Sequence, residues 1–137
     1  MKQISFVVPG QPVAKGRART SAHGGHFTPK KTRVYENQVA AYASEAMYGK
    51  LPWGGPIEVS IEAYMMIPSS WGFKKRLTAI AGQIQPIVRP DLDNIEKSAL
   101  DGMNKIVFVD DCQVTKVTKF KAYAENPRLC ITVTGQE

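Results

Sequence analysis

The sequence predicts one α/β (α+β) domain, in which a small mixed β-sheet has helices packed on it. Its 137 residues are the length of a single ordinary domain, and a hydrophobic content of 43% is enough for one core. Strand-like and helix-like apolar patterns follow one another in the order β-α-β-α-α-β-β-β. We therefore expect a single domain that spans residues 1–137.

The N-terminal third is expected to form a strand, a long loop and a helix. Apolar and polar residues alternate over residues 3–8, which predicts a strand that ends at Pro9. Residues 9–30 are polar and rich in glycine, and loops of this length are usually functional or disordered. Apolar residues at mostly helical spacing then predict a helix from Thr32 to about Tyr48.

The middle third is expected to hold the clearest strand of the chain. Residues 57–64 alternate between apolar and polar side chains, which indicates a strand with one solvated face. Residues 69–81 are predicted to form a second helix, and residues 82–90 a loop that Pro90 closes.

A third helix is expected from about Asp93 to Met103. Asp93 is a good N-cap residue, and Glu96 follows three residues later, as in a capping box. The apolar residues 106–109 then predict a short strand.

The C-terminal end is expected to form a closing hairpin. Residues 113–124 and 128–134 have strand character, and Glu125, Asn126 and Pro127 between them favour a turn. The first of these strands has a basic face or edge, with Lys116, Lys119 and Lys121.

The charge of the chain is distributed unevenly. The formal net charge is +6 and the pI is about 9.4, a balance that favours polyanionic partners, nucleic acid first. All five aspartates nevertheless fall between positions 91 and 111, namely Asp91, Asp93, Asp101, Asp110 and Asp111. The rest of the chain has eighteen basic residues and only seven acidic ones. We therefore expect a basic body with one acidic site.

The aspartates are candidate ligands for a hard cation. In an extended chain Asp91 and Asp93 would point the same way, and Asp110 and Asp111 follow the predicted strand 106–109. Carboxylate oxygens without a competing His/Cys set suit Mg²⁺ or Mn²⁺. The structural alternative is an acidic helix start followed by an Asp-Asp turn, since both positions favour aspartate.

Basic residues near these aspartates allow two interpretations. Lys97 lies four residues after Asp93 and four before Asp101, which on a helix gives either an ion-pair ladder or a cation over a scissile phosphate. In the loop, Lys15, Arg17 and Arg19 alternate, so an extended chain would present them on one side. That arrangement favours phosphate contacts, with a solvated loop as the alternative.

The sequence also indicates the cellular compartment of the protein and the redox state of its cysteines. Cys112 and Cys130 have no metal-type spacing, and no run of 18 or more apolar residues exists. The N-terminus has neither the length nor the small-residue cleavage site of a signal peptide. We expect a cytoplasmic protein with reduced thiols and no membrane association.

The stretch DLDNIEKSALDGMNKIVFVDDCQV, residues 91–114, resembles the signature of RusA-type Holliday-junction resolvases. These are small endodeoxyribonucleases that are common in prophages. The signature has a D-x-D-N-hydrophobic-x-K element, an Asp four residues after the Lys, and a strand that ends in D-D-x-Q. Two N-terminal stretches, GQPVAKGRART (residues 10–20) and FTPKKTRVYE (residues 27–36), also resemble segments of phage and Gram-positive members.

The resemblance implies roles for individual residues. Asp91, Asp93 and Asp111 match the three essential acidic residues of the family, which are thought to bind Mg²⁺, and Lys97 matches its essential lysine. Asp110 would be secondary and Asp101 structural. Pro90 stands where some members have a basic residue, so Arg89 would supply that phosphate contact instead.

The resemblance also implies an activity and an assembly. Members are homodimers with an α/β fold that nick two opposed strands of a four-way DNA junction symmetrically. We therefore expect a Mg²⁺-dependent junction endonuclease, with Mn²⁺ as a possible substitute and no small-molecule cofactor. The sequence leaves two alternatives open, a non-catalytic DNA-binding or architectural protein with a structural cation, and a nuclease for branched or flapped DNA more generally.

Overall fold

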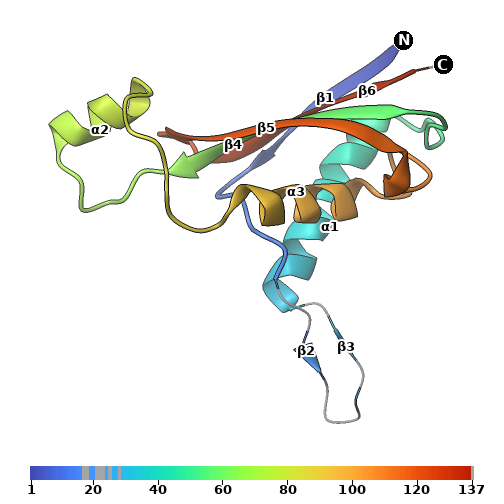
Figure 1. Ribbon diagram of the computed structural model, residues 1–137, viewed down its shortest axis with the longest axis horizontal. Coiled ribbons are helices and arrows are strands. Elements are labelled where there is room, and N and C mark those ends of the chain that lie inside the picture. Colours follow the sequence, from blue (N-terminus) through green and yellow to red (C-terminus); the bar gives the residue numbers. More distant parts are fainter. Residues whose placement is uncertain (17–18, 21–23, 25, 28, 137) are drawn as a thin grey trace.

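The computed structural model describes residues 1–16, 19–20, 24, 26–27 and 29–136 of the chain. A four-stranded mixed sheet forms the centre of the fold, as predicted (Figure 1). Its strands, in spatial order, are β1 (Lys2–Pro9), β6 (Arg128–Gly135), β4 (Ile57–Met66) and β5 (Val114–Ala124). The first three strands pair antiparallel, whereas β4 and β5 pair parallel.

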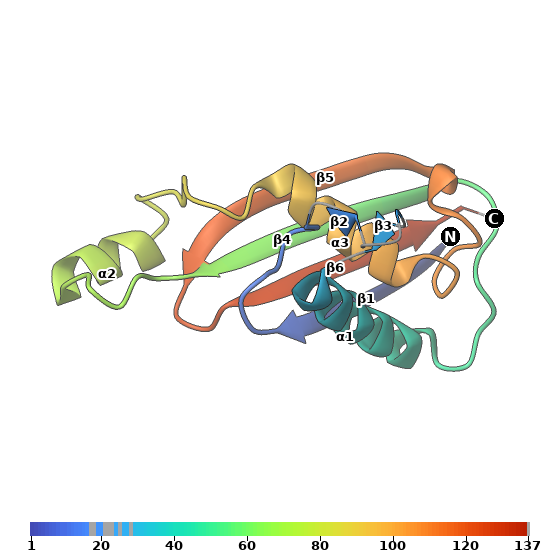
Figure 2. The same ribbon diagram turned by 90° about the horizontal axis from the view of Figure 1, so that it is seen from below.

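Two helices cover one face of the sheet (Figures 1 and 2). These are α1 (Lys30–Met47) and α3 (Leu92–Met103), and a short 3₁₀ helix η1 (Asp111–Gln113) precedes β5. Helix α2 (Phe73–Ile80) lies beyond one end of the sheet and is shorter than the predicted helix 69–81. The long N-terminal loop contains a pair of two-residue strands, β2 (Arg19–Thr20) and β3 (His26–Phe27).

The core lies between the sheet and the two helices. Inward-facing residues of β1 and β4 alternate with solvated ones, which confirms the predicted strand periods. Helices α1 and α3 pack so closely that a Cβ atom on Gly102 would lie 2.7 Å from the Val39 side chain and 2.9 Å from the Glu36 carbonyl oxygen. Only glycine fits at this crossing.

The predicted closing hairpin is wrong. Strands β5 and β6 follow each other in the chain, but β4 lies between them and pairs with both. The reason is the connection from β4 to β5, because α3 carries the chain back to the start of β4. β5 must then run parallel to β4, as in other helical crossover connections.

The predicted strand 106–109 is also wrong. Val107 and Phe108 are fully buried, but they lie in turns that follow α3. Phe108 makes only isolated bridges, to Trp53 and to Asn104, and Lys105 has a positive φ of 68°. The apolar run therefore reflects burial of a compact turn rather than strand pairing.

The close approach of α1 and α3 gives a stability prediction. Gly102→Ala should lower the free energy of unfolding by about 1–3 kcal/mol, since overpacking a filled site costs that much. Gly54→Ala is the matched control, because nothing lies within 4 Å of a Cβ atom there. Urea unfolding measures both variants, and equal midpoints for Gly102→Ala and wild type would contradict this packing.

Candidate active site

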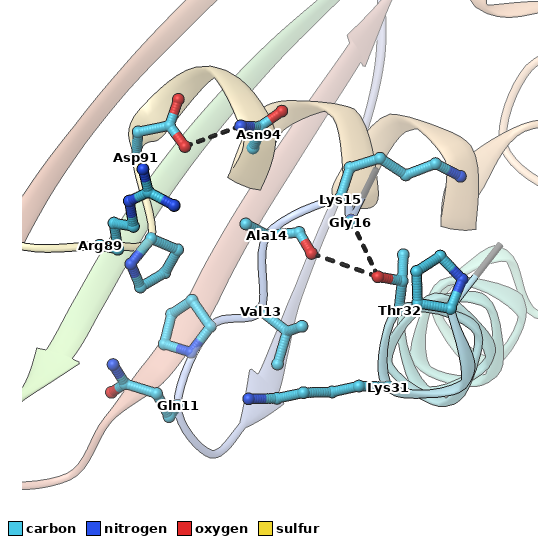
Figure 3. A pocket seen from close by; sticks show the side chains of 13 residues that line it. Gln11, Val13, Ala14, Lys15, Gly16, Lys31, Thr32, Arg89, Asp91 and Asn94 are labelled. Atoms are coloured by element: carbon cyan, nitrogen blue, oxygen red, sulfur yellow. Dashed lines mark hydrogen bonds between the residues drawn. The ribbon is translucent and has the colours of Figure 1, made fainter. Parts of the chain in front are cut away.

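A cleft of about 1200 Å³ opens beside the start of α3. Three chain segments line it: residues 11–16 after β1, the start of α1, and residues 89–94 (Figure 3). Arg89 and Asp91 lie on one wall, and Lys31 extends from α1 on the opposite side. The cleft therefore combines an acidic residue with cations from two distant parts of the sequence.

Asp91 is the N-cap residue of α3, two residues earlier than the predicted N-cap. Its backbone is extended, with φ −80° and ψ 156°, and the helix begins at Leu92. The Asn94 side-chain amide donates a hydrogen bond of 2.8 Å to the Asp91 carboxylate. The predicted cap at Asp93 is thus corrected to Asp91, and Asn94 fixes the orientation of the Asp91 carboxylate.

Asp93 faces strand β5 instead of capping the helix. Its carboxylate lies 2.7 Å from the Lys119 ammonium, which is also 2.9 Å from Glu96. The hydrogen bond and the positive charge of Lys119 lower the pKa of Asp93 below its ordinary value. The same hydrogen bond raises the pKa of Lys119. The Glu96 carboxylate is engaged by this lysine, so the predicted capping box does not form.

The ion-pair ladder along α3, one of the two interpretations of Lys97, does not form either. Asp93 pairs with Lys119, while Asp101 pairs with Lys15 at 2.9 Å. Within the described part of the chain, Lys97 has no ion-pair partner and is exposed at the helix surface. Its ammonium is therefore available for another negatively charged group.

Lys15 joins the N-terminal loop to both helices. Its ammonium lies 2.8 Å from Glu36 of α1 and 2.9 Å from Asp101 of α3. Burial lowers the pKa of Lys15, but the hydrogen bonds to these two carboxylates outweigh that effect and raise it. The Lys15 backbone N–H also donates to the Asn94 carbonyl at 2.8 Å. This lysine holds the base of the loop against α1 and α3.

Arg17 and Arg19 are the other two loop residues that are predicted to contact DNA. Arg19 lies in β2 beside Phe27 of β3, and Arg17 lies outside the described residues. The base of this loop is fixed further by Gly16, whose N–H donates to Thr32 Oγ1 at 2.9 Å.

Asp111 lies at the opposite end of α3 from Asp91 and Asp93. It belongs to η1, whose Gln113 amide donates to the Trp53 and Gly55 carbonyls at the end of the sheet where both termini lie (Figure 2). Lys119, the partner of Asp93, stands five residues into β5 from Val114, a rise of about 17 Å. Helix α3 spans a similar length, about 18 Å for its 12 residues.

The three aspartates that are predicted to bind the metal are therefore divided between two places within one chain. Asp91 and Asp93 both stand at the start of α3, and Asp111 lies at its other end. Among the residues that the structure describes, no group of three or more His, Cys, Asp or Glu side chains could hold a metal ion. Asp110 has a structural contact, since its carboxylate accepts from the Cys112 N–H at 3.1 Å and caps η1. Hydrogen bonds from the Cys112 thiol and N–H lower the pKa of Asp110.

Sequence reasoning missed two contributors to this site. Lys119 was visible only as part of a basic strand, because its partner Asp93 lies 26 residues away in the chain. Asn94 gave a local signal, an amide three residues after an acidic N-cap, which could have been used to place Asp91.

An α+β fold that has an acidic helix start beside a cationic cleft fits a protein that acts on nucleic acid. The model of the endodeoxyribonuclease RusA family matches residues 9–134, so the chain belongs to this family of endodeoxyribonucleases. A relative from Bacillus subtilis (strain 168), the uncharacterized protein YqaN, is 33% identical over 138 residues, which cover 97% of this chain and 96% of that protein. Within the described residues, no helix is long and apolar enough to cross a membrane.

The ion pair between β5 and α3 gives a titration prediction. Lys119→Ala should raise the pKa of Asp93 toward its ordinary value of 3.8, because the hydrogen bond and the positive charge are both lost. Carbon-13 NMR of the side-chain carboxyl measures it. Lys116→Ala is the matched control, an exposed lysine of the same strand that has no ion pair with α3 among the described residues. An unchanged Asp93 pKa in Lys119→Ala would refute the pairing.

Proposed function

We propose that this endodeoxyribonuclease resolves four-way DNA junctions as a homodimer, by Mg²⁺-dependent symmetric hydrolysis of two opposed strands. The observation that carries the proposal is the placement of Asp91 and Asp93 at the start of α3, where Asp91 shares a cleft with Arg89 and Lys31. Membership of the endodeoxyribonuclease RusA family supports branched DNA as the substrate.

The cleft is suited to a DNA backbone. Its volume of about 1200 Å³ is larger than a single phosphate needs, and its cations come from both walls. Arg89 can contact a phosphate with two parallel hydrogen bonds, whereas Lys31 acts as a point charge. DNA that enters between them passes directly beside the carboxylate of Asp91.

The carboxylates fit Mg²⁺ by their chemistry, but one chain does not assemble all three. Asp91 and Asp93 are oxygen ligands of the kind that Mg²⁺ prefers, and Asn94 already orients the first of them. Asp111 of the same chain lies at the other end of α3. In the homodimer that we propose, the second copy supplies its own Asp111 to this pair, and Mn²⁺ would suit the same oxygen ligands.

The side chains then have distinct roles. A bound metal ion would supply an activated water and stabilise the leaving oxygen. Asp91 and Asp93 hold the ion, and Asn94 keeps the Asp91 carboxylate in position. Lys97, which is exposed on the same helix, offsets negative charge on the phosphate as it reacts. Lys119 neutralises Asp93 and so reduces the repulsion between the two carboxylates.

Loss of a ligand should separate binding from cleavage. Asp91→Asn and Asp111→Asn should each lower the nicking rate more than about a hundredfold, since loss of groups that only support ligands already costs about 10- to 100-fold. Junction affinity should stay near that of wild type. The assay follows a labelled synthetic junction with Mg²⁺ or EDTA, and wild-type cutting by either variant would refute the site.

The same assay separates the competing functions. A flap and a linear duplex serve as competitors, and equal cutting of junction and flap would indicate a broader branched-DNA nuclease. Junction binding without any Mg²⁺-dependent product from the wild-type protein would indicate an architectural protein.

A site shared between copies should allow two inactive variants to complement each other. In a heterodimer of Asp91→Asn and Asp111→Asn chains, one site carries both substitutions and the other carries neither. After subunit exchange, an equal mixture should recover about a quarter of the wild-type sites, as a symmetric dimer requires. Nicking of one junction strand measures the recovery. No activity above either variant alone would mean that each chain builds its own site.

A further inference from the structure

The outer edge of β5 is open in the described part of the structure. β5 is 11 residues long and pairs only with β4, so its other edge carries unpaired backbone groups (Figure 2). Phe120 is 43% exposed on this strand. A long edge strand with exposed apolar side chains pairs readily with another strand, and proteins usually cover such edges.

Helix α2 presents a second apolar surface next to this edge. Phe73, Leu77 and Ile80 are 77%, 49% and 41% exposed, and their i, i+4, i+7 spacing places them on one stripe of the helix. On α2 itself Ala79 is buried, and just before the helix Trp71 packs edge-on against Tyr123 of β5. A continuous stripe along a helix fits a protein surface better than a DNA groove, for which one or two wedge residues suffice.

The charges along β5 identify a matching surface. The strand is preceded by Asp110 and Asp111. Its lysines are Lys116 near the start, Lys119 at the middle and Lys121 in the second half. Antiparallel pairing of two β5 strands across a two-fold axis sets the acidic start of each beside the basic half of the other. The opposite edge strand, β1, holds Lys2 and no acidic residue, so it lacks this complementarity.

We propose that a second copy of this chain pairs with β5 through its own β5, antiparallel and edge to edge, with the α2 stripe packed on the start of the partner's strand. This inference rests on the proposed function, in which the partner's Asp111 must reach Asp91 and Asp93. Lys119 contacts Asp93, and Lys121 donates to the Val88 and Pro90 carbonyls at 2.8 and 3.1 Å. The second half of β5 thus lies beside the start of α3, where the pairing brings the partner's acidic end.

For the partner's Asp111 to reach Asp91 and Asp93, the α3 helices of both copies must lie on the same face of one continuous sheet. A two-fold axis perpendicular to the sheet, near residues 116–118 of β5, leaves both copies of α3 on one face. The two α3 helices then run in opposite directions, so the start of each lies toward the η1 end of the other. This gives two equivalent sites, one for each of two opposed DNA strands.

Sedimentation equilibrium without DNA or metal tests the surface. Phe120→Asp and Leu77→Asp should each raise the dimer dissociation constant at least tenfold, because each buries a charge in the contact. The matched control is Val7→Asp, a 46% exposed apolar residue on the edge strand β1. A wild-type chain that is monomeric at all concentrations overturns the proposal, and so does a dimer that only Val7→Asp disrupts.

Cysteine cross-linking tests the strand pairing without weakening it. Lys116→Cys/Thr118→Cys, made with Cys112→Ser, brings cysteines opposite each other in any two-fold register centred between residues 116 and 118. The control carries Gln3→Cys/Ser5→Cys on β1 with the same Cys112→Ser change. A covalent dimer from the β5 variant alone is expected on a non-reducing gel. Cross-linking of only the β1 variant, or of neither, overturns the inference.

These outcomes are independent of catalysis. A dimer joined through β5 that does not cut junctions would refute the proposed function and leave the interface intact. Junction cutting by a dimer joined through β1 would refute the interface alone.

Discussion

The parallel pairing of β4 and β5 is the constraint on which the site depends. Because the two strands run the same way, α3 must return along the sheet between them. The start of α3 therefore lies beside the middle of β5, where Lys119 meets Asp93. The end of the helix leads to the start of β5, where Asp111 lies. The same crossover that brings Asp91 to the cleft, and Asp93 to the helix start beside it, takes Asp111 away from both.

Electrostatic contacts hold the two ends of this arrangement. Lys119 and Lys121 fix the start of α3 and the segment before it to β5, and Lys15 fixes the far half of α3 to α1 through Asp101 and Glu36. Three of the cations that make the chain basic thus have acidic or carbonyl partners inside the protein. Arg89 and Lys31 in the cleft, with Lys97 on α3, are placed to meet phosphate instead.

Local apolar patterns in the sequence predicted most helices and strands, but they did not predict which distant strands pair with each other. Alternation identified β1 and β4, and helical spacing identified α1 and α3 within two residues. The closing hairpin failed because adjacency in sequence does not reveal that β4 inserts between β5 and β6. The turn at Val107 failed because an apolar run reports burial and not backbone pairing.

The candidate site was predictable in composition but not in geometry. The concentration of aspartates indicated an oxygen-ligand site, but the distance along α3 between Asp93 and Asp111 follows only from the crossover.

The most direct test of the shared metal site is a crystal structure of the homodimer grown with Mn²⁺, with the metal located by anomalous scattering. We expect an ion between Asp91 and Asp93 of one copy and Asp111 of the other. An ion held by all three aspartates of a single chain would contradict this arrangement.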